Sequence, residues 1–182
     1  MSSARELSSL QITLRPFRES DLEDFYGWAS DDEVTRFMTW ETFKSKEKAR
    51  EFLKGVIIPH PWFRAICTKE DKPKVIGHVV MEQGSGIHIC RAEAGYAISR
   101  KYWGNGFATK ALTRALHTAF QEVEGLKRIQ ALVLPENVAS QRVLHKAGFV
   151  PEGLLRSYVN IKGNIRDCIL YGYVSPAAAS TS

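Results

Sequence analysis

Long hydrophobic runs are missing from this sequence of 182 residues. No apolar segment approaches the roughly 20 residues that a membrane-spanning helix needs. The first nine residues lack the apolar core of a secretory signal, and they include Glu6, an acidic residue of the kind that transit peptides usually avoid. We therefore expect a soluble, cytoplasmic protein that does not enter a membrane.

Cysteines and closely spaced metal ligands are also scarce. Three cysteines occur, and none belongs to a Cys-x-x-Cys pair, so neither a disulfide framework nor a zinc site is indicated. The five histidines are scattered without the spacing of metal ligands. We predict that the protein binds no metal, and that Cys90 and Cys168 are buried packing residues rather than nucleophiles.

Blocks of like charge are absent as well. The formal net charge is +5, with positive and negative residues interspersed, which favours anionic ligands and permits nucleic acid without indicating it. The 44% hydrophobic share is normal for one folded domain. We predict a single domain over residues 10–175, between disordered tails at 1–9 and 176–182.

The apolar spacing that is present predicts strands alternating with helices. Ser20 and Glu23 form a capping box for the first helix, and Ser45 is the expected N-cap of the second. The most regular helical stripe spans 108–123, and Gly125 ends it. The predicted strands lie at 12–15, 63–67, 75–81, 92–98, 129–134, 154–159 and 167–174. The long helix joins 92–98 to 129–134, which predicts one parallel pair in an otherwise antiparallel α/β (α+β) sheet.

A glycine-rich turn precedes the long helix. Gly104 and Gly106 allow the backbone to turn tightly and to approach a ligand, and the helix start adds free N–H groups. Lys101 and Lys110 flank the turn and can neutralise phosphate charge. This setting favours a phosphate or pyrophosphate site, with a simple flexible turn as the alternative.

A second segment follows the next predicted strand. Asn137 opens a helix whose end is marked by Gly148, and Ser140 lies in its first turn. Asparagine is common at a helix N-cap, so capping and ligand contact are both open interpretations of Asn137. Ser140 has the same two interpretations.

These segments, in this order, resemble the GNAT superfamily of N-acetyltransferases, over most of the chain from Leu14-Arg15-Pro16-Phe17 to the closing hairpin. The coenzyme A loop of that family lands on Trp103, Gly106 and Ala108, with Trp103 departing from the usual Gln or Arg. The resemblance implies a mixed, mostly antiparallel sheet of about seven strands with helices on both faces. The most similar branch is the ribosomal-protein alanine N-acetyltransferases, through Asp21, Glu93-Ala94-Gly95-Tyr96 and Asn137-x-x-Ser140.

The resemblance also implies the cosubstrate and its contacts. Acetyl-CoA is expected to lie between splayed strands and to pass its acetyl group directly to an amine in a ternary complex. The implied cofactor-binding residues are Tyr96, Ala97, Ile98, Trp103, Gly104, Asn105, Gly106, Phe107, Ala108, Thr109, Asn137 and Ser140.

Acetyl transfer requires a neutral amine, so a carboxylate or a water held by one should remove its proton. The family position of the base falls on Glu93, with Glu82 in reserve; a solvent-facing carboxylate that attracts a cationic substrate is the alternative for Glu93. The tyrosine that protonates the thiolate in many members is replaced by Leu144. Ser140 takes that role by resemblance to the branch, and a contact with the cofactor is its other predicted role.

Several functions stay open from the sequence. The acceptor is a protein N-terminus or a small amine such as a polyamine, and the protein is a monomer or a homodimer. A non-catalytic acyl-CoA-binding module is a further alternative, prompted by Trp103 and the absent tyrosine. A Rossmann-type nucleotide-binding domain is disfavoured, because the turn follows an antiparallel meander and Thr109 occupies the place of the third small residue.

Overall fold

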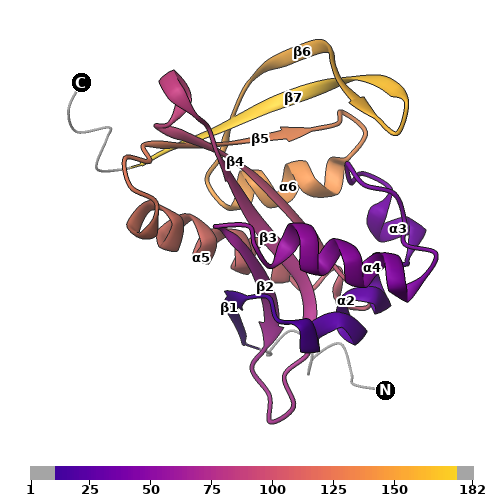
Figure 1. Cartoon of the computed structure of the whole chain (residues 1–182). Coiled ribbons are helices and arrows are strands. Elements are labelled where there is room, and N and C mark those ends of the chain that lie inside the picture. Colours follow the sequence, from indigo (N-terminus) through magenta and orange to yellow (C-terminus); the bar gives the residue numbers. More distant parts are fainter. Residues whose placement is uncertain (1–10, 176–182) are drawn as a thin grey trace. The chain divides into compact units, whose positions relative to one another are not determined.

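The computed structural model describes residues 11–175 (Figure 1). The predicted tails at 1–9 and 176–182 lie outside the described residues. The elements are β1 (Ile12–Pro16), η1 (Glu19–Asp21), α2 (Leu22–Ala29), α3 (Asp32–Thr35), α4 (Lys46–Phe52), η2 (Leu53–Ile57), β2 (Phe63–Thr68), β3 (Val75–Gln83), η3 (Gly86–His88), β4 (Arg91–Ile98), η4 (Arg100–Tyr102), α5 (Phe107–Glu122), β5 (Arg128–Val133), α6 (Val138–Lys146), β6 (Val150–Ile161) and β7 (Asn164–Val174).

Within the described range the strands form a seven-stranded sheet of order β1-β2-β3-β4-β5-β7-β6. β1 pairs antiparallel with β2, and β7 pairs antiparallel with both β5 and β6. β4 and β5 pair in parallel, with Glu93 opposite Gln130. The predicted α/β class, the mixed and mostly antiparallel sheet, and the parallel crossover are therefore confirmed.

The chain divides into two compact units. Unit 1 contains residues 11–79 and Tyr96–Ala111, and unit 2 contains Val80–Gly95 and residues 112–175. β3, β4 and α5 each contribute residues to both units. The single domain predicted over 10–175 stays a prediction, and the two units are described in turn.

Unit 1 is built on a cluster of aromatic rings. Phe25 is fully buried, and its ring meets that of Trp28 edge-on with 5.0 Å between the centroids. Phe17 meets Phe25 in the same way at 6.2 Å, and Trp40 stacks on Phe43 at 5.2 Å. Each such pair stabilises the fold by about 0.5–1.5 kcal/mol beyond its burial. Trp28 thus belongs to the core cluster of unit 1, and the partly buried Trp40 packs against it.

Arg15 and Asp21 belong to the residues that carry the resemblance to the ribosomal-protein alanine N-acetyltransferases, and they have a structural role in unit 1. The Arg15 guanidinium donates two hydrogen bonds to the Asp21 carboxylate, at 2.7 and 2.8 Å, and Arg18 N donates to Asp21 Oδ2 at 2.8 Å. This hydrogen bonding raises the pKa of Arg15. Asp21 is buried, so its charge requires these partners. The motif clamps the end of β1 to the start of α2.

Helix starts in unit 1 follow the sequence in one case and depart from it in another. Ser45 caps α4 by accepting a hydrogen bond from Lys48 N, as predicted. The capping box of Ser20 and Glu23 is wrong, because a short 3-10 turn precedes α2 and Asp21 is the residue before its first turn. Ser20 lies inside that turn, and the Asp21 carboxylate accepts from Arg18 N at the start of the turn.

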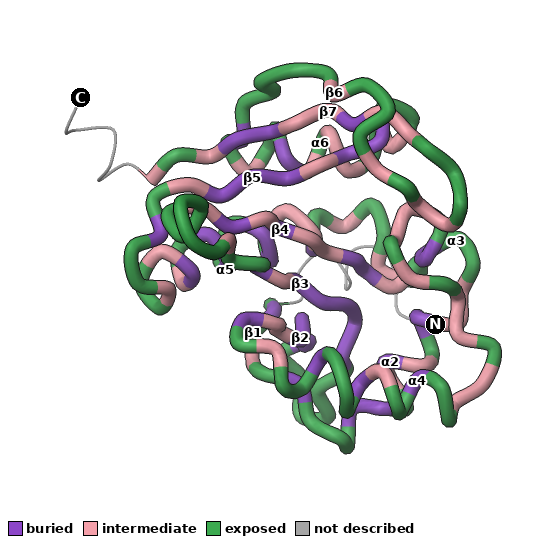
Figure 2. Tube along the Cα trace, turned by 45° about the horizontal axis from the view of Figure 1, so that its top comes forward, coloured by how far each residue is buried: buried purple, intermediate pink, exposed green. Residues whose placement is uncertain are grey.

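Unit 2 ends in a long hairpin of β6 and β7 (Figure 1). β6 is exposed along most of its length (Figure 2), including Val150, Leu154 and Tyr158. Both strands extend further than predicted, because register shifts in β6 interrupt the apolar alternation. At one of these irregularities Ser157 has a φ of 50°, and its N–H donates to Asp167 Oδ1 at 2.7 Å. Among residues 11–175 no helix is long and apolar enough to cross a membrane.

Candidate active site

The glycine turn of unit 1 has the backbone conformation that the sequence predicted. Gly104 and Gly106 have φ of +77° and +74°, in the left-handed region that favours glycine. A Cβ at either position would meet no atom within 4 Å, so glycine is required by the backbone and not by lack of space. α5 begins at Phe107, which places its free N–H groups immediately after the turn. An anion-binding helix start of this kind needs no side-chain charge.

Side chains around the turn hold it in place. The Trp103 indole Nε1 donates to the Ile98 carbonyl at 2.6 Å, which ties the turn back to the end of β4. Asn105 Nδ2 donates to the Trp103 carbonyl at 2.8 Å, and the Tyr102 ring meets the Phe107 ring edge-on at 5.9 Å. The departure at Trp103 therefore supplies a tether, a role that no sequence pattern indicated.

The rest of the predicted cofactor segment on β4 is mostly buried. The side chains of Ala97 and Ile98 are buried, and that of Tyr96 is partly so. β3 approaches this strand so closely that a Cβ at Gly77 would lie 2.1 Å from the Ala97 carbonyl oxygen. All predicted cofactor residues from Tyr96 to Thr109 thus belong to unit 1.

Unit 2 carries the predicted base. Glu93 on β4 is partly buried, and Gln130, its neighbour on β5, donates from Nε2 to Glu93 Oε2 at 3.4 Å. Gln130 is buried, so its carboxamide has few alternative partners. Its hydrogen bond orients the Glu93 carboxylate. Sequence reasoning missed Gln130, although a polar residue inside a predicted buried strand was the available signal.

Cys168, near this carboxylate, and Cys67 of unit 1 lack the lowered pKa of a nucleophilic thiol. Burial raises the pKa of the Cys168 thiol, and the negative charges of Glu93, Asp167 and Glu136 raise it further. Burial likewise raises the pKa of Cys67. A thiol kept protonated reacts poorly. Cys90 differs from the expectation, because it is exposed: it ends the loop before β4 instead of packing in a strand.

The Asn137 segment begins α6 in unit 2. Asn137 Oδ1 accepts a hydrogen bond from Ser140 N at 3.1 Å, which confirms the N-cap interpretation. Gly148 ends the helix with a φ of +91°, and Phe149 N donates back to the Leu144 carbonyl at 3.0 Å. The Leu144 side chain is fully buried, so the family's tyrosine position has become part of the core.

The described residues contain no group of three or more His, Cys, Asp or Glu side chains arranged to hold a metal ion. The prediction that no metal is bound stays a prediction. His78, the most deeply buried histidine, packs between aromatic rings, with centroid distances of 5.6 Å to Trp28 and 4.9 Å to Phe63. Burial lowers its pKa to about 3, so it is neutral at ordinary pH.

Comparison with known proteins identifies the fold and the class of enzyme. The acetyltransferase (GNAT) domain matches residues 11–150. An uncharacterized N-acetyltransferase of Bacillus subtilis, YoaA, is 33% identical, with 93% of this chain and 97% of the relative covered. The [ribosomal protein uS5]-alanine N-acetyltransferase of Escherichia coli is 35% identical over 50% of this chain and 45% of its own length.

Two solved structures are similar over nearly the whole chain. A GNAT-family acetyltransferase from Bacillus anthracis has a TM-score of 0.80 at 25% identity, covering 90% of this chain and 95% of that one. The spermidine N-acetyltransferase of Vibrio cholerae, solved with CoA and spermine, has a TM-score of 0.74 at 25% identity with the same coverage. The chain belongs to the GNAT acetyltransferase family. It is an enzyme, an N-acetyltransferase.

Proposed function

We propose that this enzyme transfers the acetyl group of acetyl-CoA directly to a primary amine, and that a protein N-terminal amine is its first acceptor. The observation that carries the donor half is the positive-φ glycine turn at the start of α5, tethered through Trp103. This turn presents backbone N–H groups to the pyrophosphate of the donor. The structure of a family member with CoA supports the choice of donor.

The acceptor half is supported by Glu93. In the proposed step the neutral amine nitrogen attacks the thioester carbon, the carbon–sulfur bond breaks, and coenzyme A leaves as the thiolate. Glu93, held by Gln130, accepts the proton that the amine loses. The thiolate is protonated by solvent or through the Ser140 hydroxyl, since Leu144 cannot supply a proton. The acetyl group therefore passes from the sulfur of coenzyme A to the amine nitrogen in one transfer, and no acyl-enzyme forms.

The charge around Glu93 favours a cationic acceptor. Glu136 and Asp167 add negative charge to the same part of unit 2, enough to act on Cys168, and Arg166 offsets one of them through its ion pair with Glu136. An ammonium ion is attracted to such a region before it loses its proton. This property suits both a protein N-terminus and a polyamine.

The proton to be removed distinguishes the two acceptors. An α-amino group with a pKa near 8 is neutral in about a tenth of molecules at pH 7, whereas an alkylamine near 10.4 is neutral in fewer than about one in a thousand. A single carboxylate such as Glu93 removes a proton more readily from an α-ammonium group than from an alkylammonium group, because the α-amine is the weaker base. The partial similarity to a ribosomal-protein alanine acetyltransferase supports the same choice, and the spermidine acetyltransferase supports the runner-up.

The lack of paired cysteines supports a cytoplasmic location.

Mass spectrometry of products tests the acceptor. Purified enzyme is incubated with acetyl-CoA, a library of peptides with free N-termini, and spermidine in the same reaction. The proposal predicts acetylated α-amines, with no product from the same peptides when their N-termini are blocked. A larger kcat/KM for spermidine than for every peptide would replace the acceptor, and binding of acetyl-CoA without any product would favour a non-catalytic module.

A further inference from the structure

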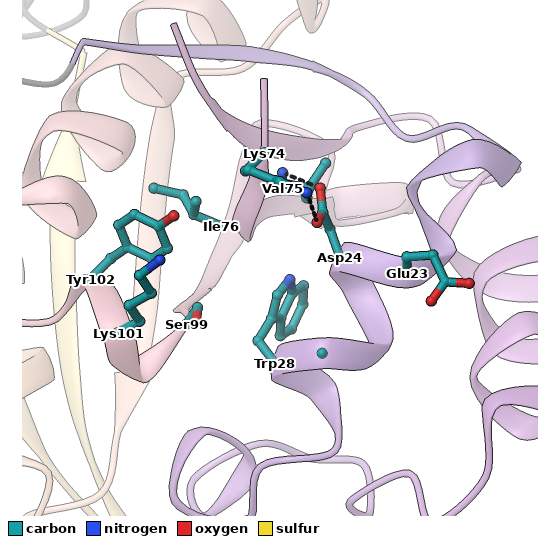
Figure 3. A pocket seen from close by; sticks show the side chains of 10 residues that line it. Glu23, Asp24, Trp28, Lys74, Val75, Ile76, Ser99, Lys101 and Tyr102 are labelled. Carbon is teal, nitrogen blue, oxygen red and sulfur yellow. Dashed lines mark hydrogen bonds and ion pairs between the residues drawn. The ribbon is translucent and has the colours of Figure 1, made fainter. Parts of the chain in front are cut away.

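A pocket of about 240 Å³ opens in unit 1 beside η4 (Figure 3). Its walls come from α2, the start of β3 and the residues that follow β4. The lining residues are Glu23, Asp24, Gly27, Trp28, Lys74, Val75, Ile76, Ser99, Lys101 and Tyr102. None of these is among the predicted cofactor-binding residues from Tyr96 to Ile98 and Trp103 to Thr109, although Lys101 flanks the glycine turn, so the pocket lies next to that turn in the chain.

The indole of Trp28 brings an unsatisfied donor to this pocket. Trp28 is 2% exposed, and its Nε1 has no hydrogen-bond acceptor within residues 11–175. Figure 3 shows the nitrogen end of the ring directed toward Val75 and Asp24. A buried N–H without an acceptor costs about 1–3 kcal/mol, so a ligand oxygen that reaches it gains that amount of binding free energy. Trp103 has no such need, because Ile98 already accepts its proton.

Both carboxylates of the pocket are already compensated. Asp24 Oδ2 accepts from Val75 N at 2.9 Å, and Oδ1 lies 3.5 Å from the Lys74 ammonium. Glu23 is paired with Lys46, and in Figure 3 its side chain points away from the pocket. The pocket therefore offers no uncompensated negative charge.

The remaining polar groups are donors. Lys101 makes no ion pair in the described chain and lies over the Tyr102 ring, with Nζ 5.5 Å from the centroid. Burial raises the pKa of Tyr102, which keeps its phenol protonated and able to donate. Ser99 adds a hydroxyl on the same wall. An indole N–H, an ammonium and two hydroxyls match the acceptor oxygens of an anion.

We propose that this pocket binds a small oxyanion, a carboxylate or a phosphate, with Trp28 Nε1 and the Lys101 ammonium as its principal donors. A volume of about 240 Å³ accommodates inorganic phosphate or a carboxylate of a few carbons. The site adjoins the cofactor segment along the chain, because Ser99 follows Ile98, and Tyr102 precedes Trp103 and contacts Phe107. The bound anion contacts η4 through Lys101 and Tyr102.

Nuclear magnetic resonance of the indole N–H groups tests this directly. Protein labelled with ¹⁵N and free of acetyl-CoA is titrated with inorganic phosphate, with acetate and with succinate at constant ionic strength. The Trp28 indole signal is identified by its loss in Trp28→Phe. We expect it to shift saturably with at least one of these anions, while the signal of Trp103, whose N–H is already bonded, stays in place.

Two charge variants decide whether the site is specific. Lys101→Gln is expected to weaken the apparent affinity roughly three- to tenfold, as loss of a partly exposed ammonium–anion pair does. Lys48→Gln removes an equally exposed charge from α4 outside the pocket and is expected to change nothing. A Trp28 signal that moves with none of the anions, or equal weakening in both variants, would overturn the proposal. A shift produced by spermidine but by no anion would overturn it as well.

Discussion

Unit 1 and unit 2 support their predicted site residues in different ways. Unit 1 surrounds its part with interlocked aromatic rings, and the glycine turn is held by the Trp103 tether and the Tyr102–Phe107 contact. In unit 2, Glu93 lies on β4 and Asn137 caps α6. The β6–β7 hairpin of the same unit has an outer strand, β6, that is exposed along most of its length. The proposed donor-binding turn of unit 1 is thus densely supported, and the proposed base of unit 2 has fewer fixed contacts.

This difference explains why polar contacts matter more in unit 2. Within residues 11–175 the hydrogen bond that orients the Glu93 carboxylate comes from Gln130, at 3.4 Å. By contrast, Gly104 and Gly106 adopt a positive φ that residues other than glycine rarely adopt. Side-chain substitutions should therefore affect chemistry mainly in unit 2, and backbone substitutions should affect donor binding mainly in unit 1.

The largest expected effect is the loss of the proposed base. Glu93→Gln keeps the shape and the hydrogen-bonding reach of the side chain but cannot accept a proton, so kcat should fall roughly 10²- to 10⁴-fold. Steady-state kinetics measure it, with the affinity for acetyl-CoA expected to stay unchanged. Glu82→Gln, on β3, is the matched control. If the control loses as much activity as the Glu93 variant, the reserve carboxylate is the base and our assignment is wrong.

The glycine turn gives the next effect. Gly106→Val forces a β-branched side chain to a φ of +74° and should weaken acetyl-CoA binding roughly tenfold or more, because the turn loses its shape. Calorimetry of acetyl-CoA binding measures the loss. Gly163→Val imposes the same strain at a φ of +80° in the β6–β7 turn, also with open space around its Cβ. Equal loss of binding in the two variants would show that the effect is a general loss of stability.

His78 tests the aromatic core of unit 1 through pH. Its folded pKa of about 3 lies below the ordinary 6.5, so protonation favours the unfolded chain, and the contribution to stability is lost as the pH falls below 6.5 toward 3. Between pH 7.5 and 5.0 this group alone should lower the free energy of unfolding by about 2 kcal/mol. Urea unfolding at both pH values measures it. His78→Phe, which retains a ring between Trp28 and Phe63, should lack this part of the pH dependence; an unchanged dependence would mean that His78 is hydrated.

The smallest effect concerns the start of α6. Asn137→Ala removes the acceptor for Ser140 N and should lower the free energy of unfolding by about 1 kcal/mol, whereas Asn137→Ser should retain most of it. Thermal unfolding of both variants measures the cap. Acetyl-CoA binding measured beside it separates the two roles, because a cofactor contact through the carboxamide predicts weaker binding even in the stable Ser variant.

Much of the fold could be predicted, because its signals are local. The stripe of α5, the caps at Ser45 and Asn137 and the positive-φ glycines are each specified by neighbouring residues. What failed depended on contacts distant in sequence or on competition between neighbours. Ser20 lies inside the 3-10 turn η1, where the Asp21 carboxylate accepts from Arg18 N and pairs with Arg15, and the bulges of β6 broke the alternation that marks a strand.

The candidate site was predictable in its types of residue and less so in its supporting contacts. Glu93 came from the resemblance to the family, and Asn137 and the turn at Gly104 and Gly106 came from motif and spacing. Gln130 could not be assigned a partner until the parallel register of β4 and β5 was known. The Trp103 tether depends on where an indole lies in space, which no pattern along the chain encodes.

The central claim is direct acetyl transfer from acetyl-CoA to an amine, and one measurement tests it most directly. Free thiol and acetylated amine are quantified in the same reaction, and the intact mass of the enzyme is recorded after acetyl-CoA is added without acceptor. The account predicts one acetylated amine for each thiol released and an unmodified enzyme in the absence of acceptor. An enzyme that acetylates itself and then passes the group on, or one that binds acetyl-CoA and releases no thiol with any amine, would contradict it.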